Sequence, residues 1–219
     1  MKKILISGMA LVAMAGMASA TLIQETFNQT ENTANEIAIP DGNPVGIANS
    51  LSVSGSGGGA IEDVSVNLDI QGGYNGDLYG YLVFQPTGGG AATMDVLLNQ
   101  IGTSGGSPFG SSGAGFNNIT LSDSGVSSIH GATGVPTGTW KPDDGGQTLD
   151  ATFATGGQAA DGTWTLFLAD LSAGGGTSEL VSWGVNISVV PEPVTWALVL
   201  FASVLAMPGI CRCRNVVKA

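Results

Sequence analysis

Few residues in this chain of 219 could perform acid–base or nucleophilic chemistry. His130 is the only histidine, so a hydrolytic triad has one candidate base and a histidine-rich zinc site is excluded. Ser104 has the most motif-like surroundings, in the segment GTSGGSP at positions 102–108. Because that segment is a glycine- and serine-rich loop, where such matches arise by chance, we predict no nucleophile there. We expect His130 to be a solvated loop histidine.

Adjacent acids occur twice, as Glu62-Asp63 and Asp143-Asp144. The two carboxylates of a glycosidase converge across a cleft at about 5 to 9.5 Å. Neighbouring residues on a strand point to opposite faces of the sheet, so Glu62 and Asp63 diverge. We therefore predict no catalytic residues.

Acidic residues in or beside predicted turns could supply oxygen ligands for calcium, a hard cation. The sequence shows neither EF-hand spacing nor a nonapeptide repeat, and solvated acids or turn caps are the alternative. We expect at most one structural calcium ion and no required cofactor. The calcium candidates are Asp41, Asp77, Asp123 and Asp170.

The charge of the chain is uneven. Residues 21–190 contain 16 acids and one basic residue, Lys141, which gives a formal charge of −15. Nucleic-acid binding is excluded, because it needs clustered lysine and arginine, and docking on anionic lipid is disfavoured. The cysteines, Cys211 and Cys213, both lie near the C-terminus, so the body has no disulfide framework.

The first 20 residues have the features of a secretory signal. Two lysines precede an apolar run, and the small residues Ala18 and Ala20 stand at a cleavage position for signal peptidase. The run is short and interrupted by Gly8 and Gly16, which disfavours a membrane anchor.

Residues 190–219 have the features of a second targeting segment. Pro191, Glu192 and Pro193 precede an apolar run of 17 residues from Val194 to Ile210, at the lower limit for a spanning helix. Arg212 and Arg214 follow the run and would stay cytoplasmic. The plain interpretation is a C-terminal transmembrane anchor.

The same three parts in this order resemble the PEP-CTERM sorting signal of Gram-negative bacteria. The resemblance implies recognition of the motif by an exosortase, processing of the tail, and release to the outer surface or the exopolysaccharide matrix. Cys211 and Cys213 depart from the pattern, and their juxtamembrane position would suit lipidation.

The body is predicted to be all-β. Ile61–Ile70 alternates apolar and polar residues with the period of a half-buried strand. Further strands are expected at 22–27, 50–53, 78–84, 94–101, 119–121, 149–153, 163–171 and 180–189. The glycine-rich segments at 71–77 and 172–179 predict two hairpins, joining 61–70 to 78–84 and 163–171 to 180–189. Many short strands predict a β-sandwich of jelly-roll type.

Several sequence segments resemble those of a known family. They include GGYNGDLYGYLVFQPTGG (72–89), TGTWKPDDG (137–145) and DGTWTLFLADLSAGGGTSELVSWGVNI (161–187). Their order resembles the P/Homo B domain of kexin-like and furin-like proprotein convertases, which implies a galactose-binding-like jelly roll over 37–189 after a lead-in at 21–36. Gly72 and Gly73 replace the family's usual histidine and threonine. Trp164 and Trp183 are expected in the core, and Trp140 as a loop staple.

The P/Homo B resemblance does not extend to a protease. In subtilases the triad order is Asp, His, Ser, whereas Ser104 precedes His130 here, and the α/β core of a subtilase needs more chain. We therefore predict a non-enzymatic surface module whose partner is a polysaccharide or a surface protein. The alternative is a domain that assists a separate subtilase, or is a remnant of one.

Overall fold

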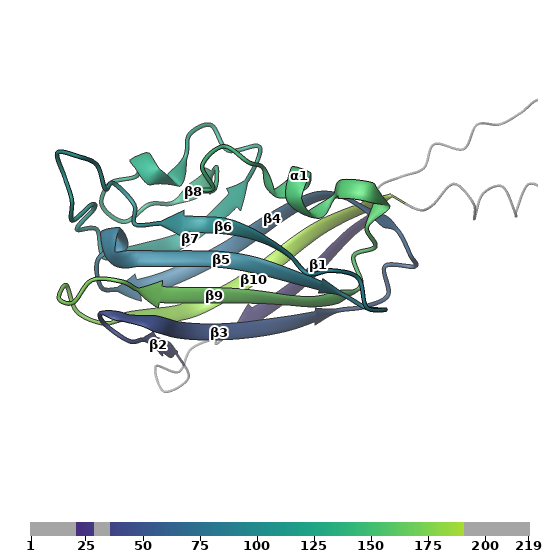
Figure 1. Cartoon of the computed structure of the whole chain (residues 1–219), viewed down its shortest axis with the longest axis horizontal. Helices are drawn as coiled ribbons and strands as arrows, with labels where there is room; N and C mark the ends of the chain where they lie inside the picture. Colours follow the sequence, from purple (N-terminus) through teal and green to yellow (C-terminus); the bar gives the residue numbers. More distant parts are fainter. Residues whose placement is uncertain (1–20, 29–35, 191–219) are drawn as a thin grey trace, which may run out of the picture.

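The computed structural model describes residues 21–28 and 36–190, which form two packed β-sheets (Figure 1). One sheet has the order β1 (Thr21–Asn28), β10 (Ser178–Val190), β4 (Ala60–Gly72), β7 (Gly115–Ser122) and β8 (Gly138–Trp140), and β2 (Ile37–Ile39) also pairs with β10. The other has the order β3 (Asn43–Val53), β9 (Gly162–Asp170), β5 (Leu78–Pro86) and β6 (Thr93–Asn99). The predicted all-β sandwich is confirmed.

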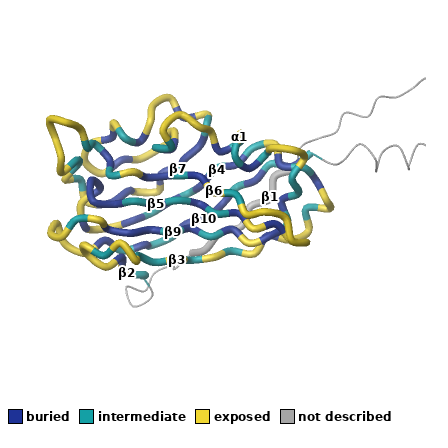
Figure 2. Tube along the Cα trace, in the orientation of Figure 1, coloured by how far each residue is buried: buried dark blue, intermediate teal, exposed yellow. Residues whose placement is uncertain are grey.

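The core lies between the sheets, because each sheet turns the apolar residues of its alternating strands inward. In Figure 2 the buried residues follow the strands, and the exposed residues lie mainly in the loops. On β4, Val64, Val66 and Leu68 are buried, while the residues between them are half-buried. Burying these side chains on both inner faces supplies the main stabilisation of the fold.

Both predicted core tryptophans are confirmed. Trp164 and Trp183 are among the largest fully buried side chains. Trp164 stacks on Phe84 with ring centroids 4.2 Å apart, and its indole N–H points to the Ala160 carbonyl. Trp140 is half-buried against the core, and its indole N–H donates to the Thr137 carbonyl at 2.8 Å, as a loop staple would.

The two predicted hairpins are wrong. β4 belongs to the six-stranded sheet and β5 to the four-stranded sheet, and β9 and β10 are divided in the same way. The glycine-rich segments between them therefore carry the chain from one sheet to the other. Periodicity identifies a strand, but it does not say which strand is its neighbour.

The strand predicted at 149–153 is also wrong, because Leu149–Phe153 is the short helix α1. The Thr148 hydroxyl accepts from the Ala151 N–H, which satisfies one free donor of the first turn. Leu149 and Phe153, one turn apart, are both buried. Three 3₁₀ turns complete the fold: η1 (Asn75–Asp77), η2 (Ile129–Gly131) and η3 (Thr155–Gly157).

Gly76 in η1 is needed for a close approach of two backbones. A Cβ atom there would collide with the carbonyl of Phe109 and with the backbone of Ser111 at 2.7 Å. The left-handed conformation in this glycine-rich segment is adopted by Gly72 and Gly73, with φ of 72° and 58°.

Both ends of the described body lie together, since Thr21 pairs with Val189 in antiparallel register. Within the described residues, no helix is long and apolar enough to cross a membrane. Both predicted targeting segments lie outside the described residues. Their candidate residues are Ala18, Ala20, Pro191, Glu192, Pro193, Arg212 and Arg214.

Candidate functional site

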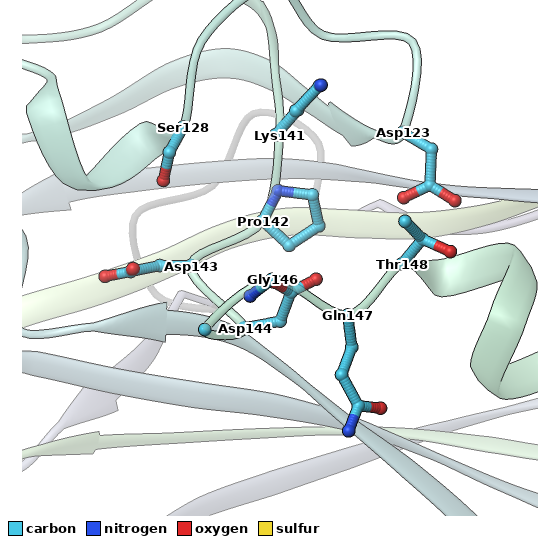
Figure 3. Close-up of a pocket in the computed structure, with 10 residues that line it drawn as sticks. Asp123, Ser128, Lys141, Pro142, Asp143, Asp144, Gly146, Gln147 and Thr148 are labelled. Atoms are coloured by element: carbon cyan, nitrogen blue, oxygen red, sulfur yellow. The ribbon is translucent and has the colours of Figure 1, made fainter.

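A pocket of about 390 Å³ opens among the loops that follow β7 and β8 (Figure 3). In Figure 3 Pro142 occupies its middle, with Lys141 and Gln147 pointing to opposite sides. Its lining comes from Asp123, Ser128, Lys141, Pro142, Asp143, Asp144, Gly145, Gly146, Gln147 and Thr148.

Most of the acidic groups in this pocket are already bonded within the protein. Asp123 accepts from the backbone N–H groups of Leu149 and Asp150 at 3.0 and 2.9 Å. Asp144 accepts from the Gly146 N–H at 2.8 Å. These carboxylates shape their own turns, so the pocket has few free polar groups for a ligand.

His130 is held at both ring nitrogens. Nδ1 lies 2.6 Å from Oδ2 of Asp143, and Nε2 lies 3.0 Å from the Thr103 carbonyl oxygen. The carbonyl accepts only, so Nε2 carries a proton, and the carboxylate makes a proton on Nδ1 favourable as well. The hydrogen bond to Asp143 and, to a lesser extent, that to Thr103 raise the pKa of His130 above its ordinary value.

This arrangement does not suit a catalytic base, because a general base needs a free lone pair facing the proton it removes. The exposed Ser104 hydroxyl accepts from the Ser107 N–H at 3.1 Å within a tight turn. The His130 side chain is 38% exposed, which agrees with the expected solvated histidine, but its ring also joins the loop at residue 103 to the loop at residue 143. Neither spacing nor composition in the sequence signals that pairing.

A second hollow of about 440 Å³ lies beside His130. It is lined mainly by small residues of two loops: Gly102, Ser107, Gly110, Ser111, Ser112, Gly113, His130, Gly131, Ala132, Thr133 and Gly134.

The four calcium candidates separate into two groups. Asp41, Asp77 and Asp170 lie near the end of the sandwich where β9 stops, whereas Asp123 caps the start of α1. Among the described residues, no three or more histidine, cysteine, aspartate or glutamate side chains are grouped so that together they could hold a metal ion.

Asp150 is a perturbed acid that the sequence did not single out. Burial, with added repulsion from Asp123 and Asp63, raises its pKa to about 6, although the Val64 N–H, which donates to it at 2.9 Å, partly opposes this. Asp95 is also buried, accepts from the Thr152 hydroxyl at 2.7 Å, and has a raised pKa caused first by burial. Such contacts join segments far apart in the sequence, so periodicity could not predict them.

The outward face of the four-stranded sheet carries a group of aromatic rings that sequence analysis also missed. Tyr81 and Phe167 are directly paired across β5 and β9 and stack with centroids 4.6 Å apart. Tyr79 meets Tyr81 edge to face at 6.1 Å. All three are half-buried, because they alternate with core residues such as Leu82 and Leu166. The sequence YGY at 79–81, which places two tyrosines on the same face of a strand, was the signal that could have revealed this group.

Uncharged residues lie beside the aromatic rings: the apolar Ala48 and Val96 pair with Phe167 and Tyr81, and polar residues lie next to them. Ser50 and Thr165 are paired across β3 and β9, and their hydroxyls lie 2.7 Å apart. Asn99 is exposed on β6, opposite Tyr79. We call the set the aromatic face; its members are Ser50, Tyr79, Tyr81, Asn99, Thr165 and Phe167.

No protein-family model matches the chain, and no curated protein matches it. Among solved structures, the chain is similar to the serine protease of Aeromonas sobria, with 16% identity and a TM-score of 0.43. The match covers 77% of this chain and 27% of that chain.

Proposed function

We propose that this protein is an exported, non-catalytic β-sandwich module that binds neutral polysaccharide through its aromatic face. The observation that supports this most is the group of half-exposed rings, Tyr79, Tyr81 and Phe167, on a sheet that turns its other side to the core. Aromatic rings present flat apolar surfaces to the faces of sugar rings, and neighbouring hydroxyl and amide groups bond the sugar hydroxyls.

The charge distribution favours a neutral ligand. Residues 21–190 carry a formal charge of −15, yet every outward residue at the centre of β9, Thr163, Thr165 and Phe167, is uncharged. An anionic polysaccharide would be repelled by the molecule as a whole, whereas a neutral one is not.

The non-catalytic part of the proposal is supported by His130, whose two ring nitrogens both face acceptors. A jelly-roll arrangement of the strands, as the P/Homo B resemblance implies, is part of the same proposal.

A glycan array of neutral and acidic polysaccharides tests the proposal. We expect the purified protein to bind one neutral class, and Tyr81→Ala to weaken that binding at least about tenfold, as loss of a central aromatic contact does. Gln147→Ala, in the loop pocket, is the matched control and should bind normally. If no neutral glycan binds, or if Gln147→Ala rather than Tyr81→Ala abolishes binding, the aromatic face is not the site.

We also propose export by signal peptidase cleavage after residue 20 and sorting through residues 190–219 to the cell surface or extracellular matrix. The support is the sequence pattern of Pro191, Glu192 and Pro193 followed by the apolar run and arginines. Mass spectrometry of the exported protein distinguishes a processed tail from a retained one. A mature end near Pro191 means exosortase-type processing, and an intact Ala219 means a retained membrane anchor.

A second candidate function is assistance to a separate subtilisin-like protease, supported by the phrases that resemble the P/Homo B domain. Co-purification of a secreted protease with this chain, lost in Tyr81→Ala but kept in Gln147→Ala, would favour it over glycan binding.

A further inference from the structure

Three turns bring acidic residues together at one end of the sandwich. Asp170 is the last residue of β9 and pairs with Asn43 of β3 on one side and Leu78 of β5 on the other. Asp77 immediately precedes Leu78, and the Leu171 N–H donates to its carbonyl at 2.8 Å. Asp41, in the turn between β2 and β3, accepts from the Gly174 N–H at 3.0 Å.

Asp170 is wholly buried, but only one of its two carboxylate oxygens has hydrogen-bond partners. Its Oδ1 accepts from the backbone N–H groups of Gly42 and Ser172 at 3.3 and 3.1 Å. Its Oδ2 has no hydrogen-bond partner. Two other buried side-chain atoms in the described part of the chain share this state, on Ser56 and Thr93, and both belong to neutral hydroxyls. A buried carboxylate oxygen without a partner is far more costly than a hydroxyl.

The neighbour of Asp170 increases this cost. Asp77 is 5% exposed, and its pKa is raised first by burial and then by the charge of Asp170, with a smaller effect from Asp41. Among the described residues, the one salt bridge joins His130 to Asp143, so no basic side chain there forms a salt bridge with Asp77 or Asp170. Two buried neighbouring carboxylates therefore need either a shared proton or a bound cation to be stable.

We propose that Asp77 and Asp170 bind a calcium ion, with the Ser172 hydroxyl, backbone carbonyls of the surrounding turns and water as further ligands. The ligand atoms available are all oxygens, which suits calcium and not zinc. Irregular turns and a mixture of carboxylate and carbonyl ligands suit calcium better than magnesium, which demands near-ideal octahedral geometry.

The small number of acidic ligands sets the expected affinity. No group of three or more acidic, histidine or cysteine side chains that could hold a metal occurs within residues 21–28 and 36–190. Two carboxylates correspond to the weak end of calcium sites, with Kd of about 10⁻⁴ to 10⁻³ M, typical of extracellular modules. Such a site fills in the millimolar calcium found outside cells, which fits the proposed export.

Thermal unfolding of the purified protein at pH 7 tests the site. After removal of metal with chelator, 10 mM CaCl₂ should raise Tm by about 3 to 10 °C, while MgCl₂ at the same concentration should raise it much less. Asp170→Asn should abolish the calcium response and, in chelator, should melt no lower than the wild type, because it removes the repulsion with Asp77. Asp69→Asn, a half-buried acid on β4, is the control and should keep the response.

Equilibrium dialysis of the wild type against ⁴⁵Ca²⁺ gives an independent measurement, whether or not Asp170→Asn folds. We expect one ion per chain, with Kd in the range given above. A wild-type Tm that calcium does not change, or changes no more than magnesium, overturns the proposal. So does a protein that binds no calcium while Asp170→Asn melts at a higher temperature, because that result assigns a shared proton to the pair.

Discussion

At the scale of single residues, two groups have acid–base properties that follow from their contacts. His130 is held between the Asp143 carboxylate and the Thr103 carbonyl, and Asp150 lies against Asp123 and Asp63. The sequence identified His130 as the only possible base, but its partner lies 13 positions away in another loop. No local pattern specifies such a contact.

The pKa of His130 can be measured directly, because the chain has one histidine. We expect NMR titration of its ring protons to give a pKa above the ordinary value of about 6.5, because Asp143 stabilises the imidazolium. Asp143→Asn should bring the pKa back towards that value. Asp144→Asn, which changes the adjacent charge without touching the ring, should change it little, and equal shifts in both variants would disprove the direct pairing.

Asp150→Asn should stabilise the protein at neutral pH. The folded state raises the pKa of Asp150 from 3.8 to about 6, so at pH 7 its ionised form costs stability, which the neutral amide avoids. The carbonyl oxygen of the introduced amide can still accept from the Val64 N–H. After allowance for solvent screening, we expect about 1 kcal/mol, or 2 to 4 °C in Tm.

The gain from Asp150→Asn should disappear near pH 4, where the wild-type carboxyl is already protonated in the folded state. Glu62→Gln, at an exposed acid, should have little effect at either pH. A lower Tm for Asp150→Asn at pH 7 would show that the carboxylate is needed in its charged form.

At the scale of elements, Asn75 explains how η1 is joined to the six-stranded sheet. Its side chain is 1% exposed; its amide donates to the carbonyls of Gly115 and Gly134, and its carbonyl accepts from the Gly115 N–H. The phrase YNGDL identified this segment correctly as distinctive, and its residues also meet the segment at 109–115. What the sequence could not give is the crossover between sheets, because strand periodicity carries no information on pairing partners.

Asn75→Ala should destabilise the protein by about 2 to 4 kcal/mol, because it leaves buried backbone groups without partners. Asn75→Asp should be at least as harmful, since a carboxylate cannot donate to the two carbonyls. Urea denaturation measures both, with Asn117→Asp, at an exposed position, as the control. If Asn75→Asp is neutral, the two donated bonds contribute nothing to stability.

At the scale of the whole molecule, the all-β class followed from composition and alternation, because glycine-rich turns and strands of period two are local properties. The division of β4, β5, β9 and β10 between the two sheets depends on long-range packing and was not predicted. The acidic body also has a collective property that no single motif reveals. Burial raises the pKa of Asp95 and Asp150, and hydrogen bonding raises that of His130.

All three shifts change stability in the same direction with pH. The contribution of His130 is fully present below its unfolded pKa of about 6.5 and is lost as pH rises through its higher folded pKa. The cost of ionised Asp95 and Asp150 is relieved as pH falls through their raised folded pKa values, which for Asp150 is about 6. Stability should therefore rise as pH falls from 8 to about 5, the reverse of ordinary acid denaturation.

Tm measured from pH 8 to 5, in chelator and at constant ionic strength, tests this collective effect. Constant salt is needed because a body with a formal charge of −15 is itself stabilised by screening. The double variant His130→Gln, Asp150→Asn should show a flatter profile than the wild type, because it removes two of the groups whose pKa values are raised in the folded state. A wild-type Tm that is highest at pH 8, or an equally steep profile in the double variant, would mean that other groups set the pH dependence.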